Sequence, residues 1–206
     1  MAKRSSAVRT NHARDPNPGA ERAAAGEIRY VPIDRLSTSY ARLRRSALPV
    51  PVELLAELPL RVAALEGTDR FEVLDGIKRL RRWIEEGRSV VPVLIEGSKT
   101  SVEHKRVLLA ANAPPRTVTA LDQAEVLASL VEDDGLSVAR AARVLGKKTT
   151  WANNRLAIRA RGSKQLKALV AHGAIGPTLA LAFTALEPDQ QDRVLACIEH
   201  YALPQT

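Results

Sequence analysis

The alternation of apolar and polar positions changes its character near residue 100. Before that point, short stretches alternate every second residue, as in a half-buried strand, and one stretch repeats every three or four residues, as in a helix. Leu80, Trp83 and Ile84 fall on one face of that helix. Pro92 lacks a backbone N–H, so its strand is expected at an edge of the sheet. Strands are predicted at 27–33, 71–74 and 90–95, and helices at 77–86 and within 53–66, where Pro59 interrupts the pattern.

From Ser101 onward every segment predicts a helix. Capping residues mark the helix starts, and glycine marks most of the ends. The predicted starts are Ser101, Thr119 with Asp122 as its capping partner, Ser137, Thr149 or Thr150, Ser163, Pro177 and Pro188, and the predicted ends include Gly135, Gly146, Gly162 and Gly173. The fold class is therefore α+β, with a small mixed N-terminal domain followed by an all-α domain.

Composition refines this division and the expected location. The predicted parts are a flexible basic arm at 1–26, an α+β domain at 27–98, a connecting helix and loop at 99–118, and an all-α domain at 119–206. Cys197 is the one cysteine, which excludes an internal disulfide and a thiolate metal cluster. No apolar run approaches the roughly 20 residues that span a bilayer, and the basic N-terminus lacks the apolar core of a secretion signal. We expect a cytoplasmic protein.

The positive charge is concentrated in one segment. The chain carries a net charge of +8, and residues 136–167 contain nine lysines and arginines and no acid, so the remainder sums to −1. A high net charge alone is shared by ribosomal proteins and membrane binders. Its concentration in two adjacent predicted helices favours a polyanion that binds there.

Those two helices have the pattern of a DNA-binding helix-turn-helix over residues 136–158, with Gly146 in the turn. The predicted inner positions are Val138, Ala141, Ala142 and Leu145 in the first helix, and Trp151, Leu156 and Ile158 in the second. Asparagine pairs with adenine and arginine with guanine, while lysines of the turn contact phosphates. The predicted DNA-binding residues are Arg140, Lys147, Lys148, Thr149, Thr150, Asn153, Asn154, Arg155 and Arg159. The alternative is a basic, solvated helical hairpin without a ligand.

A second basic segment follows the strand at 71–74, where Asp75 and Gly76 precede a helix that carries Lys78 and Arg79. Glycine lets a phosphate approach the backbone, and a helix N-terminus offers free N–H groups. The segment is suited to a triphosphate or a DNA phosphate. Asp75 is expected to cap the helix or to contact a nucleotide, and the alternative is a solvated basic helix face.

The order of these motifs resembles the ParB family of partition proteins, including its plasmid RepB branch. The matching stretches are VPI, FEVLDGIKRLRRW, VVPVLI, NAPPR and LSVARAARVLGKKTTWANNRLAI, and the resemblance covers about residues 27–200. It implies an N-terminal ParB/sulfiredoxin-like domain followed by a helix-turn-helix domain. It also implies a homodimer on a palindromic DNA site, a ParA-type ATPase partner, and a nucleoid-associated or plasmid-associated role in plasmid or chromosome segregation.

The resemblance also implies CTP binding. By position in the family motifs, the nucleotide-binding residues would be Gly76, Lys78, Arg79, Asn112 and Arg116. The family glutamates that help to hold Mg²⁺ are replaced here at two positions, by Ile77 and Ala111. These departures argue against CTP hydrolysis, and no catalytic or metal-binding residue is assigned.

Other functions stay open at this stage. A transcriptional regulator on a mobile element would use the same DNA contacts without segregation. An enzyme that hydrolyses CTP or cleaves nucleic acid is a third possibility, although a nuclease usually needs clustered carboxylates and Asp75 is the one acid beside the basic motif. The C-terminal dimerisation domain of the family has no counterpart within 206 residues, so the N-terminal or helical regions would form the dimer, or the chain is a truncated or accessory form.

Overall fold

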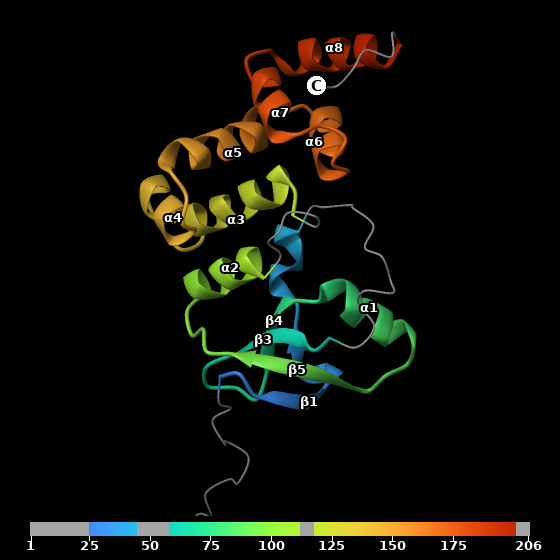
Figure 1. Ribbon diagram of the computed structural model, residues 1–206, viewed down its shortest axis with the longest axis vertical. Helices are drawn as coiled ribbons and strands as arrows, with labels where there is room; N and C mark the ends of the chain where they lie inside the picture. The colour runs from blue at the N-terminus through green and yellow to red at the C-terminus, as the bar shows by residue number, and fades with distance from the viewer. Residues whose placement is uncertain (1–24, 45–57, 112–117, 201–206) are drawn as a thin grey trace, which may run out of the picture.

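The computed structural model describes residues 25–44, 58–111 and 118–200 (Figure 1). A mixed sheet with one helix precedes a series of helices, so the predicted α+β fold class is confirmed. The sheet elements are β1 (Ile28–Pro32), β2 (Leu36–Ser37), β3 (Leu60–Ala64), β4 (Phe71–Asp75) and β5 (Val90–Glu96), with two 3-10 turns, η1 (Ile33–Arg35) and η2 (Ser39–Leu43). The helices are α1 (Ile77–Glu85), α2 (Ser101–Ala110), α3 (Ala120–Glu132), α4 (Val138–Val144), α5 (Thr149–Arg161), α6 (Lys164–Ala171), α7 (Pro177–Phe183) and α8 (Pro188–His200).

Strand β3 lies in the middle of the sheet, whose order is β1-β5-β3-β4-β2. It runs antiparallel to β4 and parallel to β5. Leu60, Val62 and Ala63 are all 0% exposed. A strand buried on both faces loses the polar alternation that identifies strands in a sequence. The helix predicted within 53–66 is therefore wrong over β3, and residues 53–57 lie outside the described residues.

The prediction that residues 90–95 form an edge strand is also wrong. β5 lies between β1 and β3. The N–H of Ile95 points to the β1 side, where the backbone carbonyl oxygen of Glu27 accepts it at 2.9 Å. Successive backbone N–H groups of a strand point to opposite sides, so the nitrogen of Pro92, three residues earlier, faces β3. Val93 is the first residue of β5 that pairs with β3. Pro92 therefore lies just before this ladder begins and costs it no hydrogen bond.

Helix α1 covers one face of the sheet (Figure 1). Its Leu80 and Trp83 are 3% and 0% exposed and pack with apolar side chains of the strands. Ile84, predicted on the same face, is 51% exposed instead. The opposite face of β4 meets η2, because the N–H of Tyr40 donates to the carboxylate of Glu72 at 3.2 Å.

Helix α3 lies at the centre of the helical part and contributes to two apolar clusters, one with α4 and the other with α6, α7 and α8. The capping box of Thr119 and Asp122 is confirmed, and so are the caps at Ser137 and Ser163. The cap predicted at Thr149 or Thr150 is wrong. Helix α5 begins at Thr149 itself, after Lys148, whose side chain makes no capping hydrogen bond.

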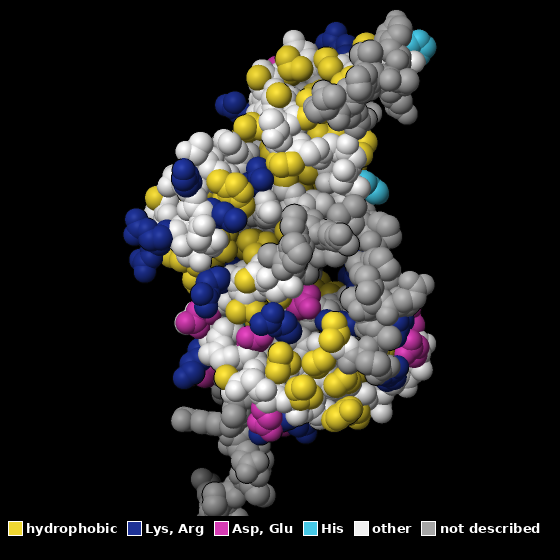
Figure 2. Space-filling model, viewed as in Figure 1, with side chains coloured by type: hydrophobic (Ala, Val, Ile, Leu, Met, Phe, Trp, Pro, Cys, Tyr) yellow, Lys and Arg dark blue, Asp and Glu magenta, His cyan; other side chains and the backbone are white. Residues whose placement is uncertain are grey.

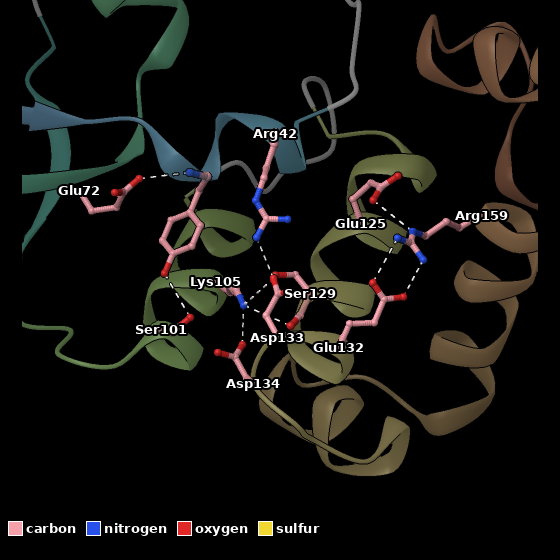
Figure 3. Close-up of polar contacts among 11 residues, drawn as sticks. Arg42, Glu72, Ser101, Lys105, Glu125, Ser129, Glu132, Asp133, Asp134 and Arg159 are labelled. Carbon is pink, nitrogen blue, oxygen red and sulfur yellow. Dashed lines mark hydrogen bonds and ion pairs between the residues drawn. The ribbon is translucent and has the colours of Figure 1, made fainter.

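The sheet and the helices are joined through η2 and α2. Tyr40 of η2 donates its hydroxyl to Ser101 of α2 at 3.2 Å, and Arg42 of η2 pairs with Asp133 at 2.8 Å, just after α3 ends (Figure 3). Leu43 is 2% exposed in the apolar cluster of α3 and α4. Because α2 contacts both β4 and α3, the domain boundaries predicted at 98 and 118 stay predictions.

A buried cation reinforces this junction. Lys105 of α2 is 1% exposed, and its Nζ donates to Asp134 at 2.5 Å and to the carbonyl oxygen of Ser129 at 3.2 Å (Figure 3). Hydrogen bonds from the Ser129 hydroxyl and from Arg42 lower the pKa of Asp133. In the three described ranges, no helix is long and apolar enough to cross a membrane.

Candidate nucleic-acid interface

Helices α4 and α5 cross through small residues. Ala141 and Ala142 of α4 and Ala152 of α5 are all 0% exposed in one apolar cluster. With no side chain beyond Cβ, these residues let the two helices approach closely. The predicted inner positions Ala141, Ala142 and Ile158 are confirmed as buried. Ala152 was missed, since a small alanine next to Trp151 adds little to the apolar pattern of the sequence.

Four other residues predicted on the inner faces of these helices are half-buried. Val138, Leu145, Trp151 and Leu156 pack against the same cluster from its margin. Gly146 has a φ of +67°, which a side-chain-bearing residue rarely adopts. The turn between α4 and α5 therefore depends on this glycine, and the α4–α5 unit (residues 137–161) has a defined geometry.

The start of α5 is exposed. Thr149, Thr150 and Asn153 are exposed there, and Asn154 is half-buried. These four side chains can donate and accept hydrogen bonds. The exposed cations of the segment are Arg140, Arg143, Lys147, Lys148, Arg161 and Lys164. Figure 2 shows Lys and Arg side chains gathered at the left of the view, over α4.

Arg155 faces α3 rather than the exposed side of α5. Its Nε donates to the side-chain oxygen of Gln123 at 2.7 Å, and its guanidinium lies 5.3 Å from the ring centroid of Trp151. Burial lowers the pKa of Arg155. Lys147 lies 5.8 Å from the same ring, so the indole is flanked by two cations.

Arg159 also faces α3. It pairs with Glu125 at 3.1 Å and with Glu132 at 2.9 Å (Figure 3). Partial burial alone would lower the pKa of Arg159. The hydrogen bonds and negative charges of the two glutamates outweigh this effect, so the pKa of Arg159 is raised. Both arginines thus hold α5 on α3. Their predicted contacts with DNA stay a prediction.

The second basic segment is built differently from its sequence pattern. Gly76 has a φ of +94°, and a Cβ there would lie 2.6 Å from Leu60 and 2.8 Å from Arg79. Arg79 is 5% exposed and donates to the carbonyl oxygen of Leu58 at 2.9 Å and to Asp75 at 3.2 Å. Asp75 does not cap α1, whose N-cap is Gly76. Packing within the protein therefore accounts for both the glycine and the arginine.

Lys78 and Arg81 are exposed cations of this segment. Partial burial lowers the pKa of Lys78, and the nearby charges of Arg44 and Arg81 lower it further against the opposite effect of Asp122. A group of like charges attracts an anion. Of the other residues implied in nucleotide binding, Asn112 and Arg116 lie outside the described residues, so their arrangement with Lys78 stays a prediction.

The fold and this surface define an α+β protein in which a five-stranded mixed sheet is followed by helices, with an exposed basic face on the α4–α5 unit. No protein-family model matches the chain, and no curated protein matches its sequence. Solved structures do match it, and three of them are ParB structures.

Two of these come from the C-terminally truncated chromosome-partitioning protein ParB of Caulobacter crescentus. The complex with the centromeric parS site is 17% identical, with a TM-score of 0.47, and the match covers 85% of this chain and 94% of that chain. The complex with CTP-gamma-S is 19% identical, with a TM-score of 0.35 and coverages of 78% and 93%. The pNOB8-like ParB N-domain is 14% identical, with a TM-score of 0.45 and coverages of 79% and 77%.

The predicted resemblance to ParB proteins thus has counterparts among solved structures, each at an identity below 20% and a TM-score below 0.5. The DNA and the nucleotide analogue belong to those complexes, and the likeness does not transfer them to this chain. The functional argument below therefore rests on the residues of this chain.

Proposed function

We propose that this chain is a sequence-specific duplex-DNA-binding protein of the ParB type, and that its α4–α5 unit is a helix-turn-helix. The observation that carries the proposal is the start of α5. It exposes Thr149, Thr150 and Asn153 beside the exposed Lys147 and Lys148, in a stretch of 32 residues without an acid. Hydrogen-bonding side chains at the start of an exposed helix, flanked by cations, suit a helix that enters the major groove.

The exposed residues divide by chemistry into two groups. Thr149, Thr150, Asn153 and Asn154 would contact base edges, since an asparagine side chain makes two hydrogen bonds to adenine. Arg140, Lys147 and Lys148 would contact phosphates and fix the register of the unit on DNA. Arg155 and Arg159 would chiefly position α5, because both are engaged by side chains of α3.

The finer role is partition. We propose a homodimer that binds a palindromic site and works with a ParA-type ATPase on a plasmid or a chromosome, in association with the nucleoid. The motif order from residue 27 to about residue 200 supports this role. Stimulation of a ParA-type ATPase by the purified protein and its DNA site tests it. DNA binding without stimulation would instead favour a transcriptional regulator on a mobile element.

Two variants test the DNA interface. The DNA site is first identified by sequencing genomic fragments that co-purify with the protein. Asn153→Ala should then lower affinity for that site by about 1–3 kcal/mol and leave binding to a mixed-sequence duplex nearly unchanged. Lys148→Ala should weaken both duplexes alike and flatten the salt dependence of binding. Equal losses on both duplexes for Asn153→Ala, or a wild-type protein that ignores duplex DNA at low salt, would refute the proposal.

A second candidate function is nucleotide binding near Lys78. The observation that favours it is that Lys78 and Arg81 are both exposed, three residues apart on α1. Arg44 adds a like charge near Lys78, and Asp122 opposes it. A pair of exposed cations on one helix face suits a triphosphate such as that of CTP with Mg²⁺. Titration with CTP, with and without Mg²⁺, measures binding directly. Lys78→Ala should weaken it, whereas Arg88→Ala, an equal change of charge at the turn between α1 and β5, should not. Equal affinities in the two variants would exclude Lys78 as a ligand.

A further inference from the structure

Two hollows border α4 and share the last residue of that helix. The first has a volume of about 580 Å³ and is lined by Ser137, Arg140 and Arg143 of the α4 region. The second, also about 580 Å³, lies between the α4–α5 turn and helix α2. Val144 lines both hollows, so they lie next to each other. One hollow therefore lies along α4 and the other at the α4–α5 turn, and both belong to the basic surface.

The second hollow brings in a cation from outside the α4–α5 unit. Its lining includes Arg106 of α2 together with Lys147, and both are exposed. No acid is among the described residues that line either hollow. Glu103, one turn before Arg106, accepts the backbone N–H groups of Lys99 and Thr100 at 2.8 and 3.1 Å. Glu103 thus caps α2 with its hydrogen bonds, while its charge also acts on Arg106.

Each hollow therefore presents a pair of cations. A bihelical unit in the major groove meets two sugar-phosphate backbones, one at each wall of the groove. Phosphate contacts from cations at both walls fix the orientation of the unit. Arg140 and Arg143 line one hollow, and Arg106 and Lys147 line the other, so each pair is available to one of these backbones.

We propose that α2 is part of the DNA interface and that Arg106 contacts a phosphate in the second hollow. The inference rests on the proposed DNA binding and extends it beyond the α4–α5 unit. Helix α2 is tied to the sheet through Tyr40 and Ser101, 3.2 Å apart, and to the end of α3 through the buried Lys105. A phosphate held by Arg106 and Lys147 therefore links the position of α2, and with it the sheet, to bound DNA.

The test measures the affinity of the full chain for a short mixed-sequence duplex at several salt concentrations, by fluorescence anisotropy. Each phosphate contact contributes about 0.9 to the slope of log affinity against log salt. Arg106→Ala should make this negative slope shallower by about 0.9, and Arg106→Lys should keep the wild-type slope. Arg88→Ala, which makes the same change in net charge on the α1–β5 turn, should leave the slope unchanged.

The outcomes separate this inference from the proposed function. If the wild-type protein binds and Arg106→Ala keeps the wild-type slope, α2 lies outside the interface and the inference fails alone. A wild-type protein that does not bind duplex DNA at low salt refutes both. If Arg88→Ala lowers the slope as much as Arg106→Ala, the effect is one of net charge, and the inference also fails. Far-UV circular dichroism of Arg106→Ala confirms folding, which an exposed side chain should not affect.

Discussion

Lys105 offers the sharpest test of how the sheet and the helices are held together. Its side chain is 1% exposed, and its ammonium group lies 2.5 Å from Asp134, whose side chain is 11% exposed. The carbonyl oxygen of Ser129 accepts a further hydrogen bond at 3.2 Å. A buried charge is stable only with such partners. Lys105→Met keeps the apolar length of the side chain and removes the charge, so it isolates the ion pair from the packing.

The expected loss follows from what remains after the substitution. Asp134 would be left nearly buried without its cation, and breaking a buried pair in this way costs about 3–5 kcal/mol. The double variant Lys105→Met with Asp134→Leu removes both charges and should recover most of that loss, because apolar residues of similar volume often replace a buried pair without net cost. Lys99→Met, an exposed lysine just before α2, should change the free energy of unfolding by less than about 0.5 kcal/mol.

Urea unfolding followed by tryptophan fluorescence measures these changes. The two tryptophans report on both parts, since Trp83 lies in the sheet core and Trp151 borders the α4–α5 cluster. A loss below about 1 kcal/mol for Lys105→Met would show that Asp134 regains water when the lysine is absent, and the account of the junction as a buried ion pair would be wrong. A double variant as unstable as the single one would show that packing, not charge, dominates.

Three further changes test the folding argument. Gly76→Ala should destabilise the protein by about 1–3 kcal/mol in urea unfolding, because the added Cβ would lie 2.6 Å from Leu60 at a positive φ. Gly67→Ala, with open space around the added Cβ, should destabilise the protein less. Equal losses in the two variants would contradict the packing argument. Because the pKa of Asp133 is lowered in the folded protein, this carboxylate stabilises the fold above its unfolded pKa of about 3.9, and the stabilisation is lost as pH falls through the folded pKa. Asp133→Asn should therefore make Tm fall less steeply as the pH is lowered. An unchanged dependence of Tm on pH would contradict this role of Asp133. Thr119→Ala should cost about 1 kcal/mol by removing the cap of α3, and an unchanged urea midpoint would show that the cap is dispensable.

Local signals in the sequence predict most of the helical part. The capping residues Thr119, Ser137 and Ser163 are found where helices begin, because a cap is a local competition for the first free N–H groups of a helix. The sheet is harder to predict. β3 is buried on both faces and has no alternation, and Pro92 is tolerated inside the sheet only because β3 begins one residue later along β5. Both facts depend on strand order, which no local pattern contains.

The candidate site shows the same limit for electrostatics. A segment of 32 residues with nine cations and no acid predicts a uniformly basic surface. The fold brings the glutamates of α3 against Arg159 and the amide of Gln123 against Arg155, so two of the nine are engaged within the protein. The fold also adds Arg106, thirty residues before the segment begins, to the same surface as Lys147. The charge that a DNA backbone would meet is therefore set by which helix faces pack together, and the acid-free segment locates that surface without defining its members.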